Sequence, residues 1–167
     1  MNTVTYRELL RGKGAHVDPV ASLEHVSAAV AGRTVAGYPH SVWQIVSHMN
    51  YWMDYEIRRI AGQRPAHPEH AIESWPTELG PATEGDWNGA RKELVARLEQ
   101  FAALSESAPE TLRVQVEAMH AGEASRSSSV EAVLWQILVH NSYHVGQIAL
   151  LLRCFGLWPP PAGGDSW

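Results

Sequence analysis

The sequence predicts an all-α protein that folds as one domain, a four-helix bundle over residues 1–167 with a flexible tail rich in Pro and Gly over about 159–167. Two observations lead to this prediction. The chain has 167 residues, of which 45% are hydrophobic and 19% charged, which suits a single globular domain with a buried core. Four segments combine apolar residues at helical spacing with signals that start or stop a helix, as expected for a bundle.

The first two helices are predicted from their terminal residues. We expect one helix over about Pro19–Ala31, with Asp18 as its N-cap and proline at the first helical position, where it is tolerated. A second helix begins after Ser41 and ends at Gly62, because glycine commonly follows the last turn. The next stretch, residues 63–83, contains four prolines and is therefore predicted to be a loop.

The last two helices follow this loop. The third runs from about Gly85 to Ser105, with apolar residues at helical spacing and charged residues on the opposite face. The fourth opens with Ser128-Ser129-Val130-Glu131, a capping box, and closes at Gly156. Between these helices, apolar and polar side chains alternate over residues 111–120, which predicts either a short hairpin or an extended crossover.

Charge and cysteine content exclude several classes of function. The net charge is −5 and no cluster of positive charge is present, so nucleic acid is not an expected partner. The N-terminus does not resemble a signal peptide, which predicts a cytoplasmic location. The single cysteine, Cys154, excludes an internal disulfide and a Cys-rich zinc site, and we expect it to be a small buried side chain.

One segment has the length and low charge of a membrane-spanning helix. Residues 132–152 contain no Asp, Glu, Lys or Arg and are long enough to span a bilayer. Polar residues crowd the middle of this segment, among them His140, Asn141 and Gln147, and a lone membrane helix would not tolerate them. We therefore expect a helix buried in the bundle and no membrane partner.

The chain contains nine histidines, and two of them have a spacing suited to a metal. His140 and His144 stand four residues apart, so that on a helix both imidazoles lie on one face and can aim at one ion. The alternative is a pair of hydrogen-bonded histidines in the bundle interior. With nine histidines in the chain, a pair at this spacing can nearly be expected by chance, so the spacing alone does not indicate a metal. Four other histidines, in loops or at helix edges, are expected at the solvated surface: His16, His40, His67 and His70.

A third histidine, His48, lies midway along the second predicted helix. Facing the pair, it would complete a three-histidine site between two helices of the bundle. Three neutral ligands leave a metal with open coordination positions and its full charge, which is typical of a reactive centre. Candidates for supporting these histidines or lining a pocket stand within two turns of them: Gln44, Tyr51, Trp52, Tyr55 and Gln147.

Motifs of other catalytic sites are missing from the sequence. The pair reads His140-Asn141-Ser142-Tyr143-His144, without the glutamate of a metalloprotease helix. There is no G-x-S-x-G nucleophile motif, no phosphate-binding glycine loop and no Glu-x-x-His pair of the di-iron bundles. Glu56, two turns past His48, is the nearest carboxylate that could serve as a general base.

Two blocks of sequence resemble a known family. They are SVWQIVSHMNYWMDYEIRRIAG, around His48, and HNSYHVGQIALLLRCFG, which contains His140 and His144. In their order and separation the blocks resemble the DinB/YfiT-like superfamily of metal-dependent enzymes. The resemblance implies a bundle of up-down-down-up topology, often dimeric, with a divalent metal on the three histidines. It also implies chemistry on a low-molecular-weight thiol, bacillithiol or mycothiol, in S-transfer or isomerisation.

We therefore expect a metal-dependent S-transferase that acts on a small-molecule substrate as a homodimer, with no catalytic residue assigned beyond the ligands. Zn or Ni is the first expectation for the ion and Fe or Cu the next, because imidazole suits all four. Two other functions stay open. One is a hydrolase in which the metal activates water, and the other is a non-catalytic metal-binding module of a stress response.

Overall fold

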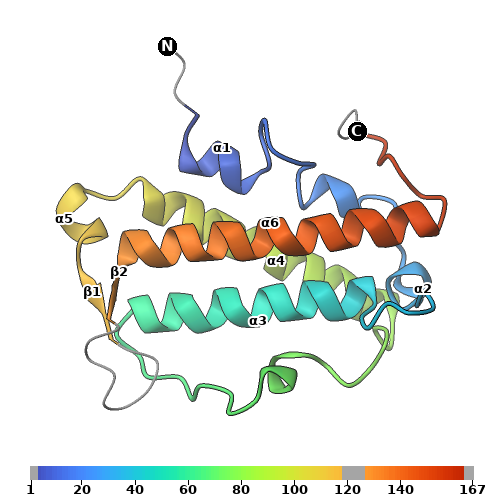
Figure 1. Ribbon diagram of the computed structural model, residues 1–167, viewed down its shortest axis with the longest axis horizontal. Helices are drawn as coiled ribbons and strands as arrows, with labels where there is room; N and C mark the ends of the chain where they lie inside the picture. Colours follow the sequence, from blue (N-terminus) through green and yellow to red (C-terminus); the bar gives the residue numbers. More distant parts are fainter. Residues whose placement is uncertain (1–3, 118–126, 164–167) are drawn as a thin grey trace.

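Three long helices form the body of the computed structural model, which describes residues 4–117 and 127–163. They are α3 (Val42–Ile60), α4 (Glu84–Ser105) and α6 (Val130–Cys154), and each of them contacts the other two. In Figure 1, α3 and α4 run in the same direction and α6 runs in the opposite one. The connection over residues 61–83 therefore has to return along the length of α3 before α4 can begin. The predicted all-α fold is confirmed.

The ends of α3 lie where the sequence predicts them. Ser41 is the N-cap: its Oγ accepts a hydrogen bond from the Gln44 N–H at 3.2 Å, and the Gln44 Oε1 accepts one from the Ser41 N–H at 3.1 Å. This reciprocal pair is a capping box, which satisfies backbone groups that the first turn leaves without helical partners. At the other end Gly62 has a φ of +79°, a conformation that favours glycine.

The start of α6 differs in one detail from the prediction. Ser129, one residue later than expected, is the N-cap, and its Oγ accepts from the Ala132 N–H at 3.1 Å. Ser128 belongs instead to a short strand, β2 (Ser128–Ser129), which pairs antiparallel with β1 (Gln115–Val116). The predicted capping box between Ser128 and Glu131 is therefore wrong, because the first helical residue is Val130 and Ser129 takes the N-cap position directly before it.

For the segment between α4 and α6, the sequence predicts either a short hairpin or an extended crossover. A single helical turn, α5 (Pro109–Leu112), precedes β1, and the β1–β2 pairing makes this segment a short hairpin and not an open crossover. The last residues of the predicted alternating stretch, 118–120, lie outside the described residues, as does the end of the predicted tail, 164–167.

The first predicted helix is wrong as a continuous element. In place of a helix over Pro19–Ala31 the structure has a 3₁₀ turn, η1 (Ala21–Leu23), and a separate short helix, α2 (Ala28–Ala31). Ser27 explains the interruption, because its Oγ accepts from the Val30 N–H at 3.4 Å and starts α2 as a second N-cap. Asp18 caps the first turn and Ser27 caps the second, so the segment forms two short turns instead of one helix.

The N-terminal segment nevertheless fills the fourth position beside the three long helices. A further short helix that the sequence did not indicate, α1 (Tyr6–Leu10), contacts α4 and α6, while α2 contacts α3 and α4. The Tyr6 hydroxyl donates a hydrogen bond to the Leu134 carbonyl at 2.7 Å. The directions of α3, α4 and α6 in Figure 1 match the last three members of an up-down-down-up bundle, but the first member is a chain of short helices.

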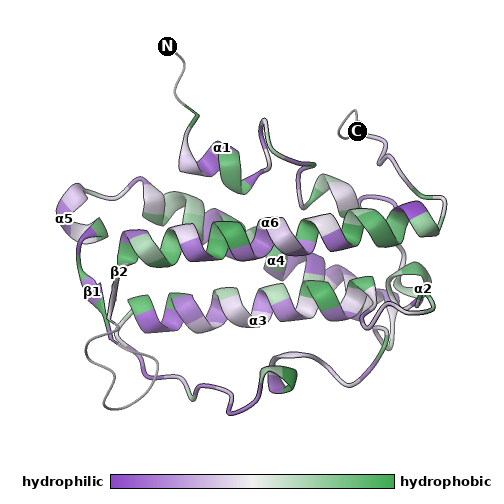
Figure 2. Ribbon diagram, viewed as in Figure 1, coloured by the Kyte–Doolittle hydropathy of each residue, from purple (hydrophilic) through white to green (hydrophobic). Residues whose placement is uncertain are grey.

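Apolar side chains from all of these elements meet in one main core. Figure 2 shows that hydrophobic residues are denser along α6 than along α3 or α4. Within the described part of the chain, no helix is apolar enough over a sufficient length to cross a membrane. The largest side chains with less than 2% exposure include Trp87, Phe101, Leu23, Ile45, Met49 and Met53.

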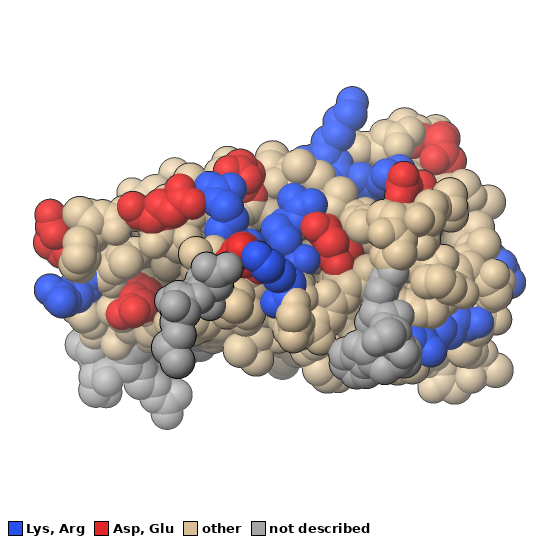
Figure 3. Space-filling model, turned by 90° about the horizontal axis from the view of Figure 1, so that it is seen from above, with Lys and Arg blue, Asp and Glu red and all other residues tan. Residues whose placement is uncertain are grey.

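Charged residues of both signs alternate on the face that carries α1 (Figure 3). Arg7 of α1 bridges Glu99 at 2.6 Å and Glu106 at 2.7 Å, so these ion pairs link α1 to the C-terminal part of α4. Exposed ion pairs contribute about 0–1 kcal/mol each. We conclude that buried contacts such as those of Tyr6 and Leu10, and not the charges, hold the N-terminal segment in place.

A close contact between two glycines ties the 61–83 connection to the end of α2. A Cβ built on Gly32 would lie 2.9 Å from the Cα of Gly80. Gly32→Ala is therefore expected to lower the free energy of unfolding by about 1–3 kcal/mol, since the backbone has to shift. Gly89→Ala in α4 is the control, because its Cβ would meet nothing within 4 Å, and it should stabilise the protein by about 0.5–1 kcal/mol. Urea unfolding measures both, and equal midpoints for Gly32→Ala and the parent protein would contradict the prediction.

Candidate metal centre

The fold brings together three histidines that lie far apart in the sequence. His48 projects from α3, and His140 and His144 project from α6, so that one potential ligand atom of each lies within 4.8 Å of the others. The His140 Nε2 is 3.2 Å from the Nε2 of His48 and 3.2 Å from the Nε2 of His144. His48 and His144 are buried and His140 is half-buried. The predicted meeting of the two helices at these three residues is therefore seen in the structure.

The other ring nitrogen of each histidine faces an oxygen. The Nδ1 of His48 lies 3.0 Å from the Ser74 Oγ and 3.3 Å from the Ser74 carbonyl, and the Nδ1 of His144 lies 2.7 Å from the Gln147 Oε1. The Ser74 hydroxyl donates to the Ala71 carbonyl at 2.7 Å, so towards His48 it acts as an acceptor. His140 has a weaker contact, 3.4 Å from its Nδ1 to the Asn141 Oδ1.

These partners determine where the ring protons lie. A neutral imidazole carries one N–H, and an oxygen acceptor at Nδ1 places it there. All three Nε2 atoms are then unprotonated, and their lone pairs converge without a donor between them. Such an arrangement is suited to a cation at its centre. Nitrogens bound tetrahedrally to one ion at about 2.0–2.1 Å lie about 3.3–3.4 Å apart, close to the 3.2 Å separations here, so the donor set fits a divalent metal.

Burial keeps these imidazoles neutral. Desolvation lowers the pKa of His48 to about 3, with further lowering by the neighbouring His144 and His140. Desolvation likewise lowers the pKa of His144 to about 4, and it lowers the pKa of His140. Because a metal binds the unprotonated ring, the site is in its binding-competent state at neutral pH.

The two glutamines predicted to support the site have different places. Gln147 accepts the hydrogen bond from the His144 Nδ1 described above, as a residue supporting a ligand would. Gln44 caps α3 and donates through its Nε2 to the Pro76 carbonyl at 2.9 Å. It therefore anchors the 61–83 connection and does not bond to a histidine of the cluster.

The predicted aromatic residues of α3 form a continuous wall beside His48. The ring of Trp52 lies 6.4 Å from that of His48 at an angle of 78°, and Tyr55 and Tyr51 contact Trp52 edge-on at 5.3 and 5.4 Å. Trp52 is half-buried, whereas Tyr55 is buried and belongs to the interior. Of the three, Trp52 is the one whose ring contacts a histidine of the cluster.

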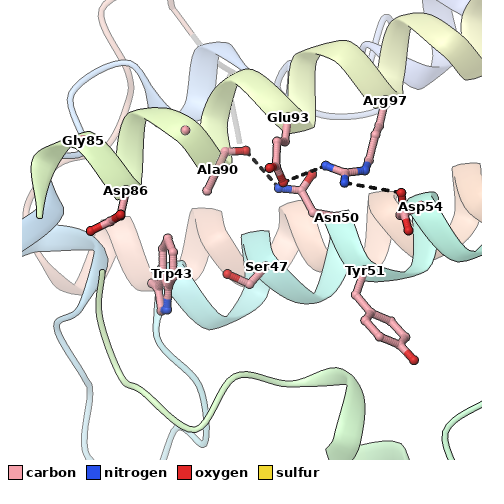
Figure 4. A pocket seen from close by; sticks show the side chains of 11 residues that line it. Trp43, Ser47, Asn50, Tyr51, Asp54, Gly85, Asp86, Ala90, Glu93 and Arg97 are labelled. Atoms are coloured by element: carbon pink, nitrogen blue, oxygen red, sulfur yellow. Dashed lines mark hydrogen bonds and ion pairs between the residues drawn. The ribbon is translucent and has the colours of Figure 1, made fainter. Parts of the chain in front are cut away.

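Tyr51 also lines a separate groove between α3 and α4, of about 540 Å³. Figure 4 shows Arg97 between two carboxylates of this groove: its guanidinium lies 2.8 Å from Glu93 and 3.6 Å from Asp54. Asn50 crosses the groove and donates to the Ala90 carbonyl at 2.9 Å. None of the three clustered histidines lines this groove, which is thus distinct from the candidate metal centre.

Several histidines are less exposed than predicted. His40 and His67 are half-buried and contact aromatic rings, His40 that of Trp75 and His67 that of Trp52. His16 is half-buried too, and its Nε2 lies 2.9 Å from the Ser142 Oγ. The prediction of solvated surface fails because the loops that carry these residues fold back on the helices. His70 is exposed as predicted.

Cys154 is a further correction. It is predicted to be buried, but it is exposed in the last turn of α6, next to the exposed Arg153.

Two residues that contact the cluster, Ser74 and Trp75, are not predicted from the sequence. Both lie in the connection over residues 61–83, in and just after the 3₁₀ turn η2 (Ala71–Ser74). Their neighbours are polar residues and prolines, which indicate only a loop. A tryptophan inside such a loop is the one signal that something there is buried.

The fold and the cluster together define a class of helical protein, in which one long helix supplies two histidines and a second helix supplies the third. The model of the DinB family matches residues 34–165, a range that contains α3, α4, α6 and all three histidines. The chain therefore belongs to the DinB family. No significant match is found among curated proteins or among solved structures.

Proposed function

We propose that the protein is a metal-dependent enzyme in which His48, His140 and His144 hold one divalent metal ion. The convergence of three Nε2 lone pairs, each turned inward by an oxygen behind its ring, carries this proposal. Zn²⁺ or Ni²⁺ is the first expectation, with Fe²⁺ and Cu²⁺ next, because all four accept imidazole ligands.

The reaction that we propose uses a small thiol, bacillithiol or mycothiol, as the nucleophile in S-transfer or in isomerisation of a substrate. The ion, when bound, supplies Lewis acidity that lowers the pKa of the thiol. The three histidines would hold the ion as neutral ligands, and three ligands would leave it with open coordination positions. Gln147 and Ser74 keep two of the rings in their binding tautomer. Trp52 offers an apolar wall next to His48 for the body of the substrate.

A hydrolase would need a general base near the ion. The surroundings of Glu56, the candidate for that base, do not favour this function. Both of its carboxylate oxygens accept hydrogen bonds from Arg59, at 3.0 and 2.8 Å, and both side chains are less than 10% exposed. Burial raises the pKa of Glu56, and the neighbouring Arg59 counteracts this. The carboxylate is thus engaged in an internal ion pair. Thiol chemistry depends less on such a base, because a thiol is far more acidic than water and gives up its proton to the solvent more readily, and it is the better-supported function.

Elemental analysis and an activity screen test the proposal together. The purified protein is expected to contain close to one equivalent of a divalent transition metal, and a chelator should lower its melting temperature. Thiol adducts and simple esters are then assayed with and without added metal. Metal-dependent turnover of thiol adducts supports the proposal. Metal-dependent turnover of esters alone favours the hydrolase, metal without turnover favours the binding module, and a protein that binds no metal overturns the centre itself.

We also propose that the protein forms a homodimer through the exposed side of α6. Four apolar side chains, each between 47% and 66% exposed, follow one another along this helix: Trp135, Val139, Tyr143 and Leu150. No charged residue interrupts residues 132–152, so two copies can face each other without repulsion. The Tyr143 ring lies 5.2 Å from that of His144, which would put the interface beside the metal centre. The cytoplasmic location expected from the sequence stays a prediction.

Val139→Arg tests this interface. Val139 is 64% exposed, so the substitution leaves the folded monomer intact but puts two like charges into the contact between copies. We expect the parent protein to elute as a dimer and the variant as a monomer in size-exclusion chromatography with light scattering. Val95→Arg, on the exposed side of α4, is the matched control and should keep the parent's mass. A parent protein that is monomeric at all concentrations would contradict the proposal.

A further inference from the structure

Trp75 lies in a stack of three aromatic rings that ends at the metal centre. Its ring is parallel to that of His48, with 3.8 Å between centroids and 11° between planes. On its other face it is parallel to the ring of His40, at 3.7 Å and 8°. The same indole meets His144 edge-on at 5.7 Å. Trp75 therefore contacts two of the three proposed ligands, although it belongs to neither of the helices that carry them.

Ser74 contacts His48 at a different place. Its Oγ and its carbonyl lie at the Nδ1 edge of the imidazole, at 3.0 and 3.3 Å, while Trp75 covers one face of the same ring. A contact at the edge and a contact at the face together fix both side-chain torsions of a histidine. Two consecutive residues of the 61–83 connection thus determine how the His48 imidazole is oriented.

His48 is the ligand that needs such support. His140 and His144 stand one turn apart on α6, so the helix itself holds them on one face. His48 comes alone from α3, and its Nε2 must reach the other two from across the bundle. A ring free to rotate about its two torsions would point its lone pair at the ion only part of the time.

The stack is itself anchored to the first turn of α3. Gln44 donates to the carbonyl of Pro76, the residue after Trp75, at 2.9 Å. The Ser41 hydroxyl donates to the Leu79 carbonyl at 2.5 Å, and His40 directly precedes Ser41 in the chain. The cap of α3 therefore holds the connection in place on the same helix that carries His48.

We propose that Trp75 is a positioning residue of the metal centre, which holds the His48 imidazole in the orientation that the ion requires. The proposal rests on the three-histidine metal site proposed above. Loss of an outer residue that orients a ligand typically weakens metal binding about 10–100-fold. Trp75→Leu is therefore expected to bind Zn²⁺ at least about 10-fold more weakly than the parent protein. Trp75→Phe keeps a flat ring against His48 and is expected to stay within about 3-fold of the parent.

Competition with a chromophoric chelator measures the Zn²⁺ affinities, and the visible spectrum of the Co²⁺-loaded protein reports the ligand geometry. Trp43→Leu is the matched control, because Trp43 is also half-buried and its ring packs against Trp87. We expect the parent, Trp43→Leu and Trp75→Phe to share one affinity range and one spectrum, and Trp75→Leu to differ in both. A Trp75→Leu protein with the parent's affinity and spectrum would overturn the positioning role. Absence of binding by the parent protein would instead overturn the metal site.

A measurement without metal covers the case in which Trp75→Leu does not fold. The nitrogen chemical shifts of the His48 ring, read by NMR in the apo protein, distinguish its tautomers. The parent should show a single Nδ1–H form, because Ser74 accepts that proton. Ser74→Ala removes the hydroxyl acceptor while leaving the Trp75 stack, and Trp75→Phe retains an aromatic ring. We expect Trp75→Phe to keep the Nδ1–H form and Ser74→Ala to add the other tautomer. A mixture of tautomers already present in the parent would overturn the proposal.

Discussion

His140→Ala is expected to abolish tight metal binding, with a loss in affinity of more than about 100-fold, because even residues behind a ligand contribute about 10–100-fold. His140 is the central member of the cluster: its Nε2 lies 3.2 Å from that of His48 and 3.2 Å from that of His144. Removing it leaves two ligands on different helices and opens the site to water. Isothermal titration with Zn²⁺ or Ni²⁺ and elemental analysis of the purified variant measure the effect.

A matched control separates this effect from the general affinity of histidine for metals. His25 is exposed and lies in the N-terminal segment, outside the cluster. His25→Ala should bind one equivalent of metal with the affinity of the parent protein. If His140→Ala retained both the stoichiometry and the affinity, the ligand assignment would be wrong even though a metal was bound.

Acid is expected to destabilise the metal-free protein well above the pH at which its carboxylates titrate. Burial lowers the pKa of His48 to about 3 and that of His144 to about 4 in the folded protein, whereas an exposed histidine has a pKa of about 6.5. At pH values between the folded and the unfolded pKa, these histidines bind protons in the unfolded chain but stay unprotonated in the folded protein. Stability is therefore fully present above about pH 6.5 and is lost as the pH falls towards 4.

The loss should be on the order of several kcal/mol, since one pKa unit corresponds to about 1.4 kcal/mol per group. Urea unfolding of the chelator-treated protein at a series of pH values between 7.5 and 4.5 measures it. His48→Gln removes one of the buried titrating groups and should flatten the dependence. A free energy of unfolding that stays constant between pH 7 and pH 5 would contradict the burial of these rings.

The parts of the fold that the sequence predicts correctly are those determined by neighbouring residues. The start of α3 follows from Ser41 and Gln44, three positions apart, and its end from Gly62. The meeting of His48 with the pair on α6 could be anticipated because each lies midway along a long helix of one bundle. In these cases helical periodicity alone determines which face a side chain occupies.

The parts that the sequence does not reveal depend on contacts between distant segments. The N-terminal segment has the composition of a helix, yet Ser27 starts a new turn. The segment therefore packs on the long helices as three separate elements, α1, η1 and α2. Trp75 stacks on His48 from a loop whose path is determined by the parallel arrangement of α3 and α4. No local pattern encodes that path. For the same reason the sequence does not reveal that His40, beside the same loop, is half-buried against Trp75.

The separation of His48 and His140 along the chain, 92 positions, would give an ion bound at the proposed centre a role in folding. An unfolded chain keeps His140 and His144 as neighbours but has lost the third ligand, so it binds the ion far less well than the native protein does. The ion then acts as a reversible cross-link that closes a loop of more than half the chain, and the entropy of that loop disfavours the open state. Cells short of the metal would thus hold a less stable protein, and its removal by proteolysis would follow the metal supply.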